Sequence, residues 1–172
     1  MQVRWLMAAG AAVAQVAFAA QYMTVEQAQR AAFPDATEFA PAASPDAAVA
    51  AALSAPQGWH PRVFAARAGE RSLGWFIVDE VIGKSELITY ALALDTKGAV
   101  ISVEILDYRE SHGGEVRMAP WRKQFVGKTA ADPVALNADI KNISGATLSC
   151  RHLAEGVHRL LQFHQRELRG AS

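Results

Sequence analysis

The chain has 172 residues, of which 51% are hydrophobic, and its 17 lysines and arginines balance 17 aspartates and glutamates. This length allows one domain with a short additional segment, and the hydrophobic content is too high for a disordered chain. The balanced charge argues against a nucleic-acid-binding protein, which needs a basic surface. A single cysteine excludes an internal disulfide and argues against a cysteine-rich zinc site, a c-type haem site and an iron–sulfur cluster.

The first 19 residues have the pattern of a secretory signal peptide. Arg4 is the only charged residue in residues 1–25, and the stretch that follows it is apolar or small except for Gln15. Ala17 and Ala19 stand at the −3 and −1 positions of a cleavage site. An uncleaved membrane anchor is the alternative, although a membrane span needs about 20 apolar residues. We therefore predict cleavage after about Ala19 and export of the remaining chain.

Residues 20–61 are predicted to form short helices followed by a linker. Thr24 precedes a helical pattern with Gln27 three residues later, which predicts a capping box at the start of a helix that Pro34 ends. Ser44, followed by Pro and Asp, is predicted to cap a second, alanine-rich helix. A Pro-Gln-Gly sequence then indicates the linker.

Residues 62–172 are predicted to form one α+β domain. Stretches rich in β-branched and aromatic residues predict strands over residues 63–68, 73–82, 87–94 and 99–108. The connections between them are short and contain glycine, which favours an antiparallel β-meander. We expect this meander to pack against a C-terminal amphipathic helix, with the short helices at the start of the chain.

The C-terminal helix is the clearest element in the sequence. Its apolar stripe consists of Leu153, Val157, Leu160, Leu161 and Leu168. The side predicted to face solvent carries Arg151, Glu155, Arg159 and Arg166. The three histidines His152, His158 and His164 are six residues apart, so successive ones are rotated by about 240° around a helix. This spacing argues against a metal site and predicts surface or boundary positions.

The segment immediately before this helix has the sequence N-I-S-G-A-T-L-S and spans residues 142–149. Its small residues form a flexible loop that presents the Thr147 hydroxyl at a helix N-terminus, where free amides favour a phosphate. The alternative is helix capping by Thr147 or Ser149, with Gly145 relaxing the turn. Local physical chemistry alone favours capping.

A known family changes this interpretation. The FMN-binding domain family has a flavinylation motif that resembles Ser144, Gly145, Ala146, Thr147, Leu148 and Ser149. The family includes the G subunit of the Rnf electron-transport complex and the C subunit of the sodium-pumping NADH:quinone oxidoreductase. In its members the motif threonine carries FMN through a phosphoester bond, which a flavin transferase installs from FAD with a divalent metal. The resemblance implies covalent FMN at Thr147, with small neighbours that give the transferase access.

The resemblance extends over about residues 73–161. Residues 110–115 read E-S-H-G-G-E where many members have E-T-P-G-L-G, and a Trp/Phe/Gly segment follows in both. It implies that the Thr147 loop lies against a second loop formed by Glu110, His112, Gly113 and Gly114, and that both contribute to the flavin site. The alternative for His112 is a solvated loop histidine.

Departures from the family pattern keep other interpretations open. Lys141 stands where many members have an aspartate, and Asp139 lies two residues earlier, so recognition by the transferase is in question. Cys150 is predicted to be a buried, inert thiol rather than a redox group. Trp75 and Tyr90 are predicted to belong to the core of the sheet rather than to stack on a flavin.

The resemblance implies a periplasmic electron-transfer flavoprotein that relays electrons between a membrane redox complex and an extracytoplasmic partner. On this interpretation the chain has no catalytic residues of its own and no resident metal. One alternative is a small flavin-dependent reductase, with His112 or Glu110 as proton donor. The other is a cofactor-free periplasmic binding or scaffold module with the same fold.

Overall fold

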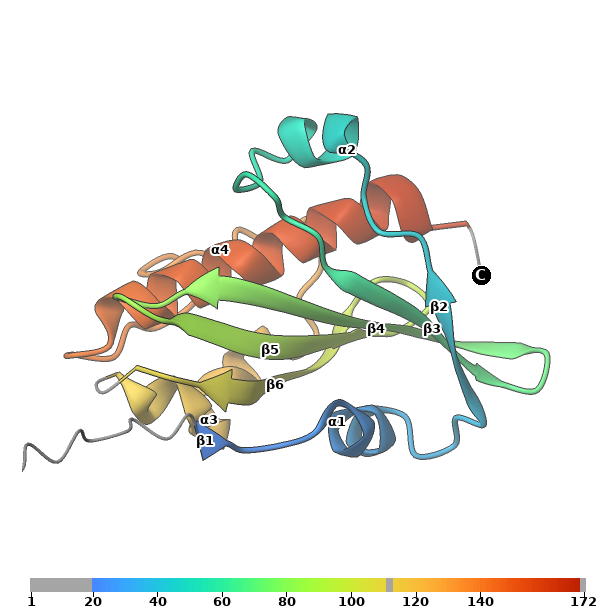
Figure 1. The fold of residues 1–172 in the computed structure, drawn as a ribbon, viewed down its shortest axis with the longest axis horizontal. Helices are drawn as coiled ribbons and strands as arrows, with labels where there is room; N and C mark the ends of the chain where they lie inside the picture. The colour runs from blue at the N-terminus through green and yellow to red at the C-terminus, as the bar shows by residue number, and fades with distance from the viewer. Residues whose placement is uncertain (1–19, 111–112, 171–172) are drawn as a thin grey trace, which may run out of the picture.

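A computed structural model of the protein describes residues 20–110 and 113–170, so the predicted signal peptide and His112 lie outside the described residues. Within them, six strands form one antiparallel sheet in the order β1-β6-β5-β4-β3-β2 (Figure 1). The strands are β1 (Ala20–Gln21), β2 (Glu38–Ala42), β3 (Arg62–Ala68), β4 (Arg71–Ile82), β5 (Leu87–Leu94) and β6 (Val100–Tyr108). The helices are α1 (Val25–Ala32), α2 (Ala47–Ala52), α3 (Ala119–Arg122) and α4 (Thr147–Phe163), with short helical turns η1 (Gly114–Arg117), η2 (Lys123–Phe125) and η3 (His164–Leu168).

The predicted meander is confirmed as strands β3 to β6, and each observed boundary lies within two residues of the prediction. The structure adds two strands that we did not predict, one at each edge of the sheet. The β2 strand contains Pro41, which lies opposite Phe64 of β3. Because β2 has a neighbour on one side only, a proline without an N–H is tolerated there. The other edge strand, β1, pairs just two residues with the end of β6.

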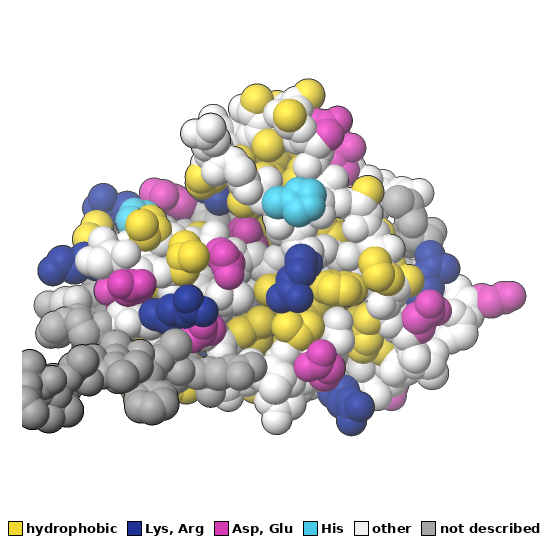
Figure 2. Space-filling view, in the orientation of Figure 1, with side chains coloured by type: hydrophobic (Ala, Val, Ile, Leu, Met, Phe, Trp, Pro, Cys, Tyr) yellow, Lys and Arg dark blue, Asp and Glu magenta, His cyan; other side chains and the backbone are white. Residues whose placement is uncertain are grey.

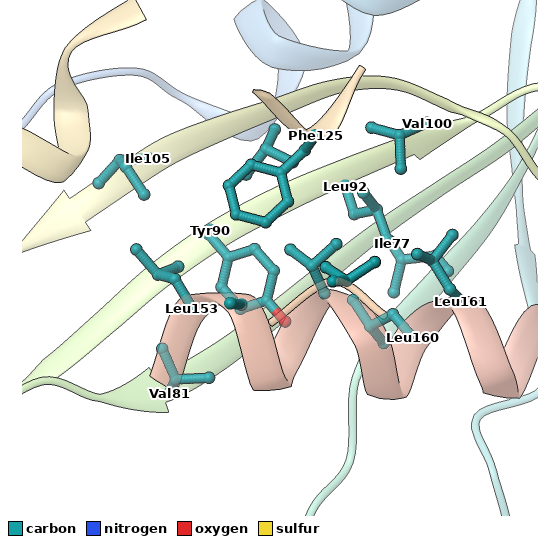
Figure 3. Packing of buried hydrophobic residues seen from close by; sticks show 14 of the residues in the cluster. Ile77, Val81, Tyr90, Leu92, Val100, Ile105, Phe125, Leu153, Leu160 and Leu161 are labelled. Carbon is teal, nitrogen blue, oxygen red and sulfur yellow. The ribbon is translucent and has the colours of Figure 1, made fainter. Parts of the chain in front are cut away.

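The C-terminal helix α4 packs on one face of the sheet, as predicted, and α1 covers the other face. The larger core lies between the sheet and α4, where alternate residues of the strands meet the apolar stripe of the helix (Figure 3). The second core lies on the other face, where Ala28 of α1 belongs to a buried cluster that includes Phe76 of β4 and Leu106 of β6. Among the described residues, no helix has the length and apolar content needed to cross a membrane. On the face drawn in Figure 2, acidic and basic side chains are interspersed.

The starts of the first two helices show one correct and one wrong prediction. The capping box of α1 is present, because the Thr24 hydroxyl accepts the Gln27 amide at 3.2 Å while the Gln27 side chain accepts the Thr24 amide at 2.9 Å. In α2 the cap is Asp46, whose carboxylate accepts the Val49 amide at 2.8 Å. Ser44 was predicted as this cap, but its hydroxyl donates to the carbonyl of Pro61 at 2.7 Å.

Two predictions for the C-terminal helix are corrected. His164 is only 2% exposed, where a surface or boundary position was predicted. It lies under the β5–β6 turn, since a Cβ added to Gly98 would fall 2.6 Å from its ring. Arg159 was predicted to face solvent, yet one of its guanidinium nitrogens is buried and the group lies 5.7 Å from the centre of the Trp59 ring. The loop that carries Trp59 covers this side of α4.

The buried His164 leads to a prediction about pH. Burial lowers the pKa of His164, with Asp95 opposing and Arg169 adding to the shift. Above about pH 6.5 the histidine is neutral in both the folded and the unfolded chain. As the pH falls through this value, the unfolded chain binds the proton first, so the free energy of unfolding decreases until the lowered folded-state pKa is passed.

We therefore expect His164→Gln to flatten the pH dependence of stability between about pH 7 and pH 5. Urea denaturation at a series of pH values measures this difference in slope. Parallel pH profiles for the wild type and the variant would contradict the proposed cost of charging His164.

Candidate functional site

The segments singled out in the sequence meet at the end of the sheet where β6 stops and α4 begins (Figure 1). Gly113 has a φ of 79° and precedes η1. A Cβ added to it would lie 3.4 Å from the Cα of Ala146 and 3.2 Å from the Oγ of Ser149. The loop that carries Gly113 and Gly114, which we call the glycine loop, is therefore in contact with the loop before α4. The two are more than thirty residues apart in the sequence.

Thr147 is the first residue of α4, and its hydroxyl does not cap the helix. The N-cap position is occupied by Ala146, which has no side-chain oxygen, and no side chain caps this end. The Oγ1 of Thr147 instead accepts a hydrogen bond from the Nδ2 of Asn142 at 3.0 Å. The capping interpretation of Thr147 and Ser149 is therefore wrong, because a cap must precede the first helical residue.

The start of α4 offers backbone donors as well as the hydroxyl. The first bond of the helix runs from the Cys150 amide to the Ala146 carbonyl at 2.9 Å, so the amides of residues 147–149 precede the hydrogen-bonded ladder. Such amides, at the positive end of the helix dipole, favour a phosphate. Gly145 is exposed, with a φ of 87° and no atom within 4 Å of an added Cβ. These residues therefore fit a phosphoryl group on Thr147, with open space beside it.

The remaining motif residues differ in exposure. Ser144 and Leu148 are exposed, and Leu148 leaves 40% of its surface accessible. Ser149 is buried, and its Oγ lies 3.4 Å from the Oη of Tyr108 at the end of β6. Burial raises the pKa of Tyr108, so its phenol is protonated at neutral pH. Sequence reasoning missed Tyr108, because one more aromatic residue in a strand carries no separate signal.

Glu110 follows β6, and its side chain contacts the turn between β4 and β5. Its Oε1 accepts hydrogen bonds from the amides of Ser85 and Glu86, the latter at 2.8 Å. Burial would raise the pKa of Glu110, but the amides of Glu86, Ser85 and Lys84 outweigh it and lower the pKa. Its carboxylate is thus ionised and fixes the turn. His112, two residues further on, lies outside the described residues.

His152 of α4 contacts the same turn, and we did not predict this contact. Its Nδ1 lies 2.6 Å from the carbonyl oxygen of Ile82 and 3.0 Å from that of Gly83. Because both partners are acceptors, Nδ1 carries the proton. The turn is therefore fixed both to the glycine loop, through Glu110, and to the first turns of α4.

Gly114 starts the helical turn η1 and is held by Arg117. The Nε of Arg117 donates to the Gly114 carbonyl at 2.8 Å. Its guanidinium group lies 4.4 Å from the ring centre of Tyr22 and 5.6 Å from that of Tyr108. These cation–π contacts place Arg117 between the chain that follows β1 and the end of β6. Arg117 thus connects Gly114 to both segments.

The carboxylate of Asp139 binds Lys128 and the backbone amides of residues 134 and 135. It accepts the Ala135 amide at 2.9 Å and forms an ion pair with Lys128 at 2.8 Å. Burial would raise the pKa of Asp139, but Lys128 and the amides of Ala135 and Val134 lower it. Lys141 has an exposed side chain, so the position of the usual family aspartate holds a cation in solvent.

The predicted burial of the other candidate residues is confirmed. Cys150 is fully buried, and burial raises the pKa of its thiol, which keeps it protonated and unreactive. Trp75 and Tyr90 are core residues, 3% and 0% exposed. The Tyr90 hydroxyl donates to the buried carboxylate of Asp79 at 2.9 Å, away from the Thr147 loop.

Residues 83–162 match the family model described as FMN-binding domain, a range that includes both loops of the site and most of α4. Residues 83–162 are an FMN-binding domain. The G subunit of the ion-translocating oxidoreductase complex of Stutzerimonas stutzeri is 32% identical over 114 residues, which cover 60% of this chain and 50% of that protein. The chain thus spans about half the length of this curated relative. The family resemblance inferred from the motif is confirmed.

In the FMN-binding domain, Gly113 and Gly127 form a matched pair that tests the contact between the loops. Their φ angles are 79° and 80°, but a Cβ at position 113 would lie 3.0 Å from the Tyr108 hydroxyl, whereas one at position 127 would meet no atom within 4 Å. Alanine at either position costs about 1–2 kcal/mol of backbone strain. We expect Gly113→Ala to lower the free energy of unfolding by about 1 kcal/mol more than Gly127→Ala does, because its Cβ is crowded by the Tyr108 hydroxyl. Urea denaturation measures this difference. Equal losses would show that the loop is not packed against α4.

Proposed function

We propose that this domain carries FMN in phosphoester linkage to Thr147 and acts as an exported electron carrier. The observation that carries the proposal is the Thr147 hydroxyl, which lies at an uncapped helix start beside the open Gly145. The match to the FMN-binding domain supports the choice of cofactor. Bound FMN supplies the redox chemistry, since a flavin exchanges one or two electrons, and the protein tethers and orients it.

Attachment requires from this chain a hydroxyl and access to it. The Thr147 oxygen forms a bond to the phosphorus of the FMN half of FAD, and the bond from that phosphorus to the AMP oxygen breaks. AMP leaves, the hydroxyl proton passes to the transferase, and no electrons are exchanged. Exposed Ser144 and Gly145 leave room for the transferase, which uses a divalent metal.

Within this proposal each loop has a separate task. The first amides of α4 bind the phosphate, and the small residues Gly145 and Ala146 allow the chain to approach it. Gly113 brings the second loop against the same helix start, close to the Ser149 and Tyr108 hydroxyls. On this proposal Gly113 and Gly114 border the flavin.

A carrier is favoured over a small reductase by the state of Glu110. A reductase needs a proton donor near the flavin. Of the two predicted donors, His112 and Glu110, only Glu110 lies within the described residues. Its lowered pKa and its bonds to the Ser85 and Glu86 amides make it a poor acid at neutral pH. Turnover of small organic acceptors by the purified protein would favour the reductase instead.

We also propose a location and partners. Residues 1–19 have the pattern of a signal peptide, which supports cleavage after about Ala19 and a periplasmic protein. The relative named above belongs to an ion-translocating oxidoreductase complex, which supports electron exchange with a membrane redox complex and with an extracytoplasmic redox protein. The flavin transferase is the partner in maturation.

One observation favours a second candidate, a cofactor-free scaffold module with the same fold. Lys141 replaces the usual family aspartate, and Asp139 cannot compensate because it is paired with Lys128. A transferase that needs a free carboxylate before the motif would not modify this chain.

The two candidates are separated by expressing the chain with a flavin transferase in an exporting host. We expect a band that fluoresces under ultraviolet light after denaturing electrophoresis, and an intact mass increased by one FMN less one water. Peptide mapping is expected to place the added mass on the peptide that contains Thr147. A dark band at the unmodified mass, with a known family member labelled in the same cells, would support the scaffold.

A further inference from the structure

The Thr147 hydroxyl is the reacting group of the proposed attachment, and its orientation depends on one side chain. We propose that Asn142 is a positioning residue, which fixes the Thr147 oxygen for phosphoryl transfer through the hydrogen bond from Nδ2 to Oγ1 at 3.0 Å. This inference rests on the proposed attachment of FMN to Thr147. Asn142 and Thr147 are five residues apart and lie on either side of a loop of small residues, so the bond closes that loop.

The backbone beside Asn142 is itself fixed, which makes such positioning effective. The carbonyl of Lys141 accepts a hydrogen bond from the Trp121 indole at 2.7 Å, and the Lys141 amide donates to the Gln124 side chain at 2.8 Å. Gln124 also donates to the Trp121 carbonyl at 3.1 Å. Trp121 is buried, so these groups form a rigid clamp next to Asn142.

Asp139 has the carboxylate nearest to Asn142 in the sequence, but it does not orient the Thr147 hydroxyl. Asp139 lies before the clamp, where Lys128 and the amides of Val134 and Ala135 occupy its oxygens. The Lys141 side chain extends into solvent. The amide of Asn142 is thus the side-chain group that contacts the hydroxyl, and it can orient the oxygen without exchanging a proton.

This chemistry defines what Asn142 contributes to the step. The Thr147 oxygen bonds to the FMN phosphorus of FAD, AMP departs with the electrons of the broken phosphorus–oxygen bond, and the hydroxyl proton goes to a base of the transferase. A neutral amide cannot accept that proton, so Asn142 acts on the geometry of the attack alone. Its loss is therefore expected to lower kcat of labelling and leave KM for the acceptor protein nearly unchanged.

The kinetic test uses the folded chain as acceptor, with purified transferase, FAD and magnesium. For Asn142→Ala we expect kcat to fall about five-fold, as for the loss of one hydrogen bond, with KM changed less than about two-fold. Thr96→Ala is the control, since it removes an exposed side chain from the β5–β6 turn and leaves both backbone bonds of the clamp intact. An unchanged kcat for Asn142→Ala, an effect confined to KM, or an equal fall in kcat for Thr96→Ala would overturn the proposal.

A second measurement needs no flavin. Three-bond couplings of Thr147 in isotope-labelled protein report its χ1 rotamer, which we expect to be single in the wild type and averaged in Asn142→Ala. Asn142→Asp has the same shape and can accept a hydrogen bond from the hydroxyl, so it is expected to restore the single rotamer. Averaging in the wild type, or in Asn142→Asp, would refute the positioning role. If the wild type is not labelled while a known family member is, the attachment proposal fails, whereas a Thr147 rotamer that stays single in Asn142→Ala refutes the positioning role alone.

Discussion

Replacing Thr147 with alanine is expected to abolish covalent flavin and to change the free energy of unfolding by less than about 0.5 kcal/mol. The hydroxyl has no part in capping α4, and its partner Asn142 is exposed. Alanine is also the better helix former, which offsets the lost contact. Denaturing electrophoresis with intact mass measures the flavin, and urea denaturation measures the stability.

Two controls make the result specific. Thr147→Ser keeps a hydroxyl at the same helix start and is expected to be labelled. Thr96→Ala removes an exposed threonine from the β5–β6 turn and is expected to be labelled like the wild type. Flavin retained by Thr147→Ala after denaturation would place the attachment elsewhere. A large loss of stability would instead show that the hydroxyl is needed for the start of α4.

The meander and α4 could be predicted because their signals are local. A period of two with glycine turns, and a period of 3.6 over seventeen residues, are visible in any window of the sequence. The edge strands β1 and β2 have no such signal. One is two residues long and the other contains Pro41, so each exists because a neighbouring strand offers its edge.

Burial of polar residues on α4 was equally hidden from the sequence. Helical periodicity placed Arg159 on the side that faces solvent, and the spacing of the histidines predicted a surface or boundary position for His164. The loop around Trp59 and the β5–β6 turn cover those positions from elsewhere in the chain. Amphipathicity reports the side of a helix that meets the sheet, and other segments decide the exposure of the rest.

The motif indicates where the candidate site lies, but long-range contacts decide how its residues are arranged. Whether Thr147 caps the helix depends on where α4 begins, and the sequence leaves this open by a residue or two. The contacts of Ser149 with Tyr108 and of His152 with Ile82 join residues 41 and 70 positions apart. No pattern of spacing indicates such pairs. The site is therefore assembled by the fold from the end of β6, the β4–β5 turn, the glycine loop and the start of α4.

The largest loss of stability is expected for Phe125→Ala, about 3–5 kcal/mol. Phe125 is fully buried in the core between the sheet and α4 (Figure 3). Its ring lies edge-to-face with that of Trp121, with ring centres 5.2 Å apart. Removing its ring leaves a cavity where η2 meets the sheet. A total stability of about 5–15 kcal/mol is typical of such domains, so the variant is expected to be marginally folded.

Val126→Ala is the matched control, because the next residue leaves 53% of its surface exposed. Its effect is expected to stay within about 0.5 kcal/mol. Urea denaturation compares both variants with the wild type. Equal midpoints for the two variants would show that η2 is not anchored in the core. The anchor also bears on the site, since Trp121 and Gln124 fix the backbone beside Asn142. Where Phe125→Ala remains folded, we therefore expect the Thr147 rotamer to become averaged, as in Asn142→Ala, because the same clamp has been loosened from its buried side.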